Sequence, residues 1–267
     1  MEMGDRFSAQ GLYNLLTRCA NIRNKCFRLA ETRIYIDSNQ VSELAVVLTD
    51  YVIATKEVDW LRELIENTFY YQDPDEQQQI LEIAQSIIQG EKPDLPRLKD
   101  LSSRRDILVQ TFAEFLEQSP AFHYDSFLLF RLKRYRDCLE QYIEVAIDEY
   151  KLEQEYQNFV ETFRRLLRGR PFHCREVHLV YENDFALYDE CYRRINERAL
   201  RESFHNILRQ GAGVEIEPSV LITLIALSPE TIYLYTEQLQ AGMVKTIENV
   251  FQERLVVRPE LSLPFHS

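Results

Sequence analysis

Residues 124–168 read YDSFLLFRLKRYRDCLEQYIEVAIDEYKLEQEYQNFVETFRRLLR and form the longest periodic segment of the chain. Its apolar side chains recur every three or four residues, which is typical of an amphipathic helix with one buried face. They are Leu128, Leu132, Tyr135, Leu139, Tyr142 and Ala146, then Tyr156, Val160, Phe163 and Leu167. The heptad phase slips at residues 150–155, where a bend or two abutting helices are expected. A long central helix therefore organises the predicted fold.

The chain beyond residue 171 changes from helical to alternating periodicity. Residues 177–181 and 185–189 alternate in the manner of strands, and residues 182–184 have the composition of a short hairpin loop. A helix is expected over residues 192–210, with glycines at its end. Residues 221–227 are apolar all round, which predicts a buried helix.

Three shorter segments complete the predicted C-terminal part. Residues 232–235 form a short strand, which joins the hairpin in a small antiparallel or mixed sheet packed with helices. Residues 243–254 are amphipathic and predict a helix, and residues 256–267 read as a docked or loose tail. The region 171–267 is therefore expected to be a small α+β region with a C-terminal helix.

The N-terminal region, residues 1–90, is predicted to be mainly helical with one strand or hairpin. Helical spacing over residues 12–29 leads into a strand near residues 33–37. Asp73 followed by Pro74 marks the start of a helix that ends near residue 88.

A loop or linker is expected over residues 91–104, which contain two prolines and mixed charge. It separates the N-terminal region from a central helical region, residues 105–170. The sequence therefore predicts an α+β protein that is predominantly helical.

Composition narrows the class of protein. The 267 residues are 45% hydrophobic and 28% charged, which is ordinary for a soluble globular chain. The net charge of −12 disfavours nucleic acid as a partner. Neither a signal peptide nor a membrane span is predicted. The five cysteines are odd in number and lack framework spacing, so reduced thiols and a cytoplasmic location are expected.

Metal and cofactor chemistry has little support in the sequence. Four potential zinc ligands occur close together, but their spacing matches no zinc finger or ribbon; they are His173, Cys174, His178 and Cys191. A carboxylate stripe on the central helix lacks the histidines of a di-metal site and is interpreted as a solvated face; it comprises Asp137, Glu140, Glu144 and Asp148. Cys174 has only its sequence neighbour His173 as a base. No cofactor is therefore predicted.

Adjacent acids at the end of the predicted hairpin raise the question of catalysis. Asp189 and Glu190 would point to opposite faces of a strand, whereas an acid–base pair must converge. A hydrolase or metal-dependent enzyme remains the alternative reading, with Asp184, Asp189, Glu190 and a histidine brought together by folding. A protein without enzymatic activity is favoured.

The strongest basic cluster lies in the stretch FRLKRYR, residues 130–136. Its cations are Arg131, Lys133, Arg134 and Arg136. On one continuous helix Arg131 and Arg134 would share a face, with Leu132 and Tyr135 turned inward. Two interpretations stay open: ion pairs within the protein, or a docking surface for an anion or a protein partner.

Five segments between residues 64 and 255 resemble, in order, the YtxC-like family of sporulation proteins from endospore-forming bacteria. They are LIENTFYYQDPDEQQQILEIA (64–84), FLLFRLKRYRDCLEQYIEVAIDEYKLEQEYQNFV (127–160), VHLVYENDFALYDE (177–190), LITLIALSPETIYLY (221–235) and TIENVFQERL (246–255). The resemblance implies a cytosolic role in sporulation and no established biochemical activity. We expect a non-enzymatic interaction or scaffold factor with an unknown protein partner, and a homo-oligomer stays open.

Overall fold

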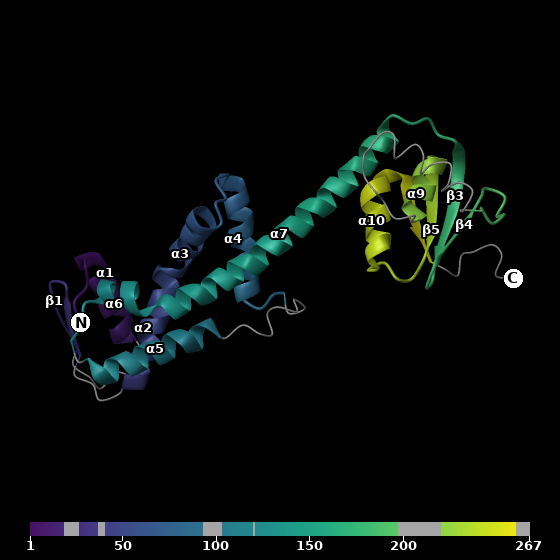
Figure 1. Ribbon diagram of the computed structural model, residues 1–267. Helices are drawn as coiled ribbons and strands as arrows, with labels where there is room; N and C mark the ends of the chain where they lie inside the picture. Colours follow the sequence, from purple (N-terminus) through teal and green to yellow (C-terminus); the bar gives the residue numbers. More distant parts are fainter. Residues whose placement is uncertain (19–26, 37–40, 93–102, 120, 197–219, 260–267) are drawn as a thin grey trace. The chain divides into compact units, whose positions relative to one another are not determined.

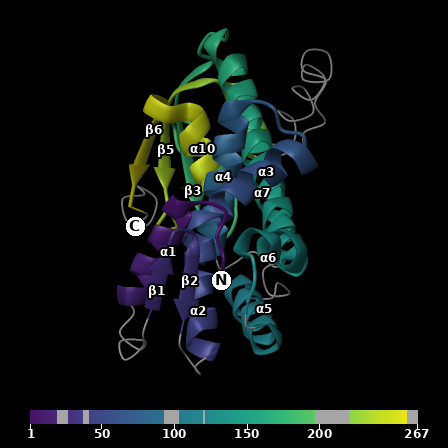
Figure 2. The same ribbon diagram turned by 90° about the vertical axis from the view of Figure 1, so that its left-hand side faces the viewer.

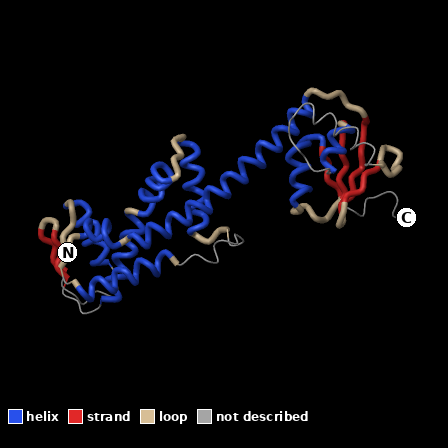
Figure 3. The backbone as a smooth tube through the Cα atoms, viewed as in Figure 1, coloured by secondary structure: helices blue, strands red, loops and turns tan. Residues whose placement is uncertain are grey.

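The computed structural model describes residues 1–18, 27–36, 41–92, 103–119, 121–196 and 220–259. Within them the chain is mainly helical and carries small sheets, which confirms the predicted α+β class (Figures 1 and 3). The chain divides into two compact units, Met1–Leu152 and Glu153–Ser267. Helix α7 (Lys133–Arg168) contributes residues to both. The four regions drawn from the sequence stay a prediction, and residues 93–102 of the expected linker lie outside the described part.

Unit 1 consists of helices and a β-hairpin. Its elements are α1 (Arg6–Arg18), β1 (Phe27–Ala30), β2 (Arg33–Ile36), α2 (Val41–Thr55), α3 (Glu57–Glu63), the π-helix η2 (Leu64–Thr68), α4 (Pro74–Ile88), α5 (Arg104–Gln118), α6 (Tyr124–Arg131) and the first part of α7. Helix α4 begins as predicted, because Asp73 Oδ1 accepts hydrogen bonds from the backbone N–H groups of Asp75 and Glu76 at 2.9 and 3.1 Å.

The hairpin corrects one sequence expectation. Helical spacing suggested a helix up to residue 29, but Phe27–Ala30 is strand β1, which pairs antiparallel with β2. Glu31 and Thr32 form the turn, and Glu31 adopts a φ of 54°. This turn brings β1 beside Ile34, which is buried in the core, so strand pairing overrides the local helical pattern.

The central periodic segment is divided differently from the prediction. Helix α7 continues through residues 150–155, where a bend or two abutting helices were expected, and the break lies at Leu132 (φ −95°, ψ 20°). The phase slip has another cause. Tyr150 belongs to the core of unit 1, whereas Tyr156 packs against the core of unit 2. The buried face of α7 therefore changes its packing partners within one helix.

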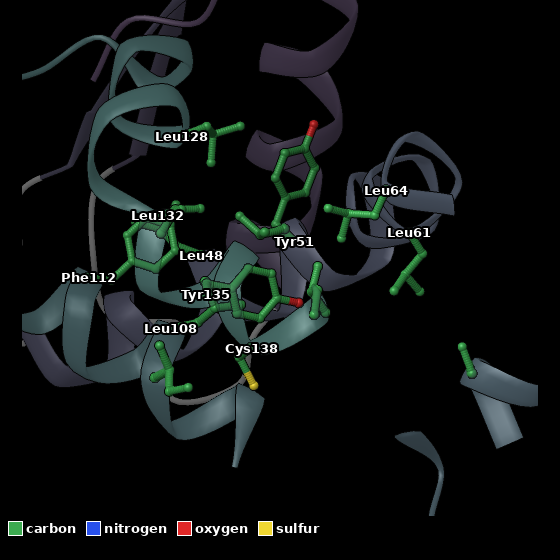
Figure 4. Packing of buried hydrophobic residues seen from close by; sticks show 14 of the residues in the cluster. Leu48, Tyr51, Leu61, Leu64, Leu108, Phe112, Leu128, Leu132, Tyr135 and Cys138 are labelled. Carbon is green, nitrogen blue, oxygen red and sulfur yellow. The ribbon is translucent and has the colours of Figure 1, made fainter. Parts of the chain in front are cut away.

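Leu132 and Tyr135 flank the start of α7 and are both buried. They pack in one cluster with Leu48 of α2 and with Leu108 and Phe112 of α5 (Figure 4). Close packing of this kind fixes side-chain orientation. The residues that surround the buried Leu132 in the sequence are exposed; they are Leu129, Phe130, Arg131, Lys133 and Arg134.

Unit 2 is a mixed sheet packed with helices. Its elements are the last part of α7, β3 (Cys174–Tyr181), β4 (Phe185–Tyr188), α9 (Val220–Leu227), β5 (Pro229–Tyr235), α10 (Gly242–Phe251), the 3-10 helix η4 (Gln252–Arg254) and β6 (Leu255–Arg258). The strand order is β4-β3-β5-β6, with β3 antiparallel to β4 and parallel to β5. Strand β6 lies parallel beside β5 (Figure 2).

The core of unit 2 lies on one face of this sheet. Val177 and Leu179 of β3 and Ile232 and Leu234 of β5 pack in one cluster with α9 and α10. Helix α9 is buried over most of its length, as its almost wholly apolar sequence predicted. The hairpin of β3 and β4 around residues 182–184 is also confirmed.

Two C-terminal expectations need correction. Residues 192–196 are not helical, since Arg194 forms a bridge with Tyr188 and the N–H of Ile195 donates to Leu187 O. The rest of the helix predicted over residues 192–210 lies outside the described part. Residues 255–258, whose larger part was assigned to a tail, form β6, because pairing with β5 satisfies their backbone groups.

Candidate functional site

Exposed apolar and cationic side chains gather where α6 meets α7. We define the α6–α7 surface as Leu129, Phe130, Arg131, Lys133 and Arg134. The exposed fractions of Leu129 and Phe130 are 66% and 73%. Large apolar side chains exposed next to one another are uncommon away from interaction sites. The three cations beside them are exposed as well.

The break at Leu132 changes how these cations are arranged. The sequence placed Arg131 and Arg134 on one face of a continuous helix, but Arg131 ends α6 and Arg134 lies in α7. The Arg131 guanidinium carbon lies 5.5 Å from the centroid of the Phe115 ring, a cation–π contact. Within the described residues, Lys133 and Arg134 form no ion pair.

Arg136, the fourth cation of the cluster, has a different environment. Its Nη2 lies 2.8 Å from Glu63 Oε2, and its guanidinium carbon lies 5.9 Å from the Trp60 ring centroid. These contacts connect α7 with α3. Arg136 therefore has partners inside the protein, and the α6–α7 surface does not include it.

A buried carboxylate lies beneath the junction. Glu57 is 7% exposed, and its Oε2 lies 2.6 Å from Arg104 Nη1. The Tyr135 hydroxyl donates to the same oxygen. Burial, followed by the nearby Glu57 carboxylate, raises the pKa of Tyr135 well above its ordinary value. The sequence gives no signal for this group, because its three residues come from distant segments and no local motif marks them.

Two of the candidate catalytic acids hold the backbone of turns. Asp184 Oδ1 accepts from the N–H of Phe185 in the hairpin loop. Asp189 Oδ1 accepts from the N–H groups of Cys191 and Arg193 at 2.9 and 2.8 Å, which forms a turn after β4. Glu190 is exposed. Asp184 and Asp189 therefore act as acceptors in turns.

The residues weighed as metal ligands are also dispersed. His173 Nδ1 lies 2.9 Å from Pro171 O, the Cys174 thiol donates to Leu227 O at 3.6 Å, and Cys191 is exposed. In the described segments no three His, Cys, Asp or Glu side chains are grouped as metal ligands would be. The acidic stripe of α7 is outward-facing, with Asp137, Glu144 and Asp148 exposed and Glu140 half-buried.

Comparison with known proteins identifies relatives. The YtxC-like family model matches residues 42–256. The chain is 36% identical over 213 residues to a Bacillus subtilis (strain 168) protein described as uncharacterized protein YtxC, covering 80% of this chain and 75% of that protein. No solved structure matches. None of the described helices has both the length and the apolarity of a membrane span. The chain belongs to the YtxC-like family.

Proposed function

We propose that the chain is a non-enzymatic interaction or scaffold factor of the sporulation programme, located in the cytoplasm, and that its α6–α7 surface docks a partner protein. The observation that carries the docking is the exposure of Leu129 and Phe130 directly beside Arg131, Lys133 and Arg134. Exposed apolar anchors with a charged rim are typical of protein interfaces.

Charge indicates the chemistry of the partner. The whole chain carries −12, yet three cations meet on this surface, and two of them form no ion pair among the described residues. An acidic segment with apolar side chains complements such a surface. The apolar side chains would bury Leu129 and Phe130, and the acids would steer the encounter and fix its register. A nucleic acid would offer phosphates but would leave the apolar pair without a matching contact.

The sporulation role is what the resemblance to the family implies. Five segments resemble the family in order, and the family model matches most of the chain. The fold supports an interaction role in a separate way, since two of the three candidate catalytic acids, Asp184 and Asp189, accept backbone hydrogen bonds in turns.

Site-specific photo-cross-linking tests the docking. A photoreactive amino acid at Phe130, in cells during sporulation, is expected to capture one protein through a segment that combines acidic and apolar residues. The double substitution Lys133→Glu with Arg134→Glu is expected to lower capture at least tenfold and to prevent restoration of heat-resistant spores in a deletion strain. Capture through a segment that lacks acidic or apolar residues would contradict the proposed chemistry of the partner.

The matched control changes the charge by the same amount elsewhere. Arg193→Glu with Lys245→Glu alters two exposed cations of unit 2 and is expected to leave capture and spore yield at the level of the wild type. Near-normal spore yield from the Lys133→Glu/Arg134→Glu variant would place the functional surface elsewhere. Equal defects in both double variants would indicate a general effect of charge.

A further inference from the structure

A small hollow in unit 2 is surrounded by arginines. It has a volume of about 100 Å³ and lies where α10 ends and η4 begins. Arg164, Arg168 and Arg254 line it, together with Phe251, Gln252 and Glu253 among others. The chain as a whole is acidic, with a charge of −12, so three arginines in the lining of one small hollow are unusual for this composition.

Arg164 is held in place before any ligand arrives. Its Nε and Nη2 both donate to the backbone carbonyl of Asn249, at 2.9 and 2.7 Å. Asn249 is fixed in turn, because its Nδ2 donates to the Tyr156 hydroxyl at 2.7 Å. A guanidinium group has five N–H donors, so Arg164 keeps Nη1 for a further acceptor. Because the Arg164 side chain is already ordered, it would lose little further conformational entropy when a ligand binds.

Arg254 and Arg168 complete the lining with different degrees of freedom. The Arg254 guanidinium carbon lies 4.8 Å from the Phe172 ring centroid, and its Nη1 donates weakly to Pro229 O at 3.5 Å. The side chain of Arg168 is 70% exposed, and its Nη1 lies 3.5 Å from Glu161 Oε1. Two arginines are thus positioned by the fold, and the third can move towards a ligand.

The backbone at this point is also unusual. Gln252 has a φ of 49°, in the left-handed region that side-chain-bearing residues rarely adopt. This turn ends α10 and leads the chain through η4 into β6. It thereby places Arg254 beside the α7 arginines, which lie 86 to 90 residues earlier in the sequence.

We propose that this hollow is a binding site for a phosphate group. Planar guanidinium groups match phosphate oxygens through paired, charge-assisted N–H···O bonds. A hollow of about 100 Å³ has room for one tetrahedral ion or one phosphoryl group. The acids nearby, Glu253 in the lining and Glu161 beside Arg168, lower the net positive charge without cancelling it. The proposal is independent of docking at the α6–α7 surface.

Titration of the full-length chain with inorganic phosphate tests the site. Ionic strength is held constant with sodium chloride, and the arginine Nε–H signals are followed by ¹⁵N NMR. Saturable shifts are expected at Arg164 and Arg168. Arg168→Gln is expected to weaken phosphate binding about tenfold, the loss of one charge-assisted hydrogen bond, and Glu253→Gln to strengthen it.

Arg165→Gln is the matched control, because Arg165 is an exposed neighbour that does not line the hollow. It is expected to leave phosphate affinity within twofold of the wild type. Equal weakening by both substitutions, or shifts that never saturate, would overturn the proposal. A parallel titration with O-phosphoserine distinguishes the source of the ligand. Tighter binding of phosphoserine supports a phosphoryl group on a larger molecule, and tighter binding of inorganic phosphate supports the free ion.

Discussion

His178 is a buried titratable side chain with an unusual aromatic environment. It lies on β3 and is 4% exposed. Its ring stacks on Tyr192 and Tyr233, with centroid distances of 4.3 and 5.3 Å, and its Nδ1 lies 3.1 Å from the Tyr235 hydroxyl. Burial lowers the pKa of His178 below its ordinary value of 6.5, and Arg258 lowers it further. The nearby Glu176 and Asp189 oppose this shift.

The depressed pKa predicts a pH-dependent stability. Below about pH 6.5 the unfolded chain takes up a proton at this histidine more readily than the folded chain does. The free energy of unfolding of unit 2 is therefore expected to decrease as the pH is lowered. This group contributes at most about 1.4 kcal/mol per pH unit to that decrease. The free energy of unfolding can be measured by urea unfolding at several pH values between 7.5 and 5.5. His178→Phe is expected to make this free energy depend less steeply on pH.

A control for this prediction lies five residues earlier in the sequence. His173 is exposed at the start of the strand region, and His173→Phe is expected to keep the slope of the wild type. If the His178→Phe variant keeps that slope as well, other groups govern the acid sensitivity of unit 2.

Three helices of unit 1 are joined by one buried ion pair and one tyrosine hydrogen bond. Glu57 begins α3, Arg104 begins α5, and Tyr135 lies in the first turn of α7. Glu57 accepts from both of the others. Such a pair contributes little net stability over apolar packing, but the loss of one partner leaves a buried charge without compensation.

Removal of either member is expected to destabilise unit 1 strongly. Arg104→Ala should lower the free energy of unfolding by about 3 kcal/mol. Adding Glu57→Ala to this variant should lower that free energy by less than Glu57→Ala does in the wild type. A double-mutant cycle in urea measures the coupling. Arg105→Ala is the control, since its pair with Asp50 is about half exposed and is expected to contribute under about 1 kcal/mol. Strictly additive losses at Glu57 and Arg104 would contradict the coupling.

The same elements show what sequence can and cannot predict. Asp73 and Pro74 marked the start of α4, because capping is a local interaction. The break at Leu132 was not predicted, since Leu132 fits the helical apolar phase and is buried in either case. Strand β6 gave no strong alternating signal in four residues and depends on β5 for pairing. The arginine hollow joins residues about 90 positions apart, and such proximity follows only from the tertiary fold.

At the scale of the molecule, two separate cores share one helix. Core residues of unit 1 occur in α7 up to Tyr150, and those of unit 2 include Val160, Phe163 and Leu167 of the same helix. Units with separate cores can unfold in separate transitions. The only tryptophan of the chain, Trp60, packs against the core of unit 1, so its fluorescence reports on that unit.

A core substitution in unit 2 tests this independence. Leu224 is fully buried in α9, and Leu224→Ala is expected to destabilise unit 2 by about 3 kcal/mol. The unfolding transition followed by circular dichroism is expected to begin at a lower urea concentration than in the wild type. The urea midpoint of the transition followed by Trp60 fluorescence is expected to stay unchanged. Equal shifts of both signals would show that the two units unfold as one.

The order of strands in unit 2 also has a consequence during translation. Unit 1 is fully synthesised once residue 152 has been added, whereas the sheet of unit 2 needs β6, which pairs with β5 and ends at Arg258. At typical rates of synthesis this delay lasts about 5 to 20 seconds. Near the end of that interval the apolar helix α9 has been synthesised while its sheet is still incomplete. Released chains truncated between β5 and β6 carry α9 without a complete sheet, so they are expected to need chaperones most.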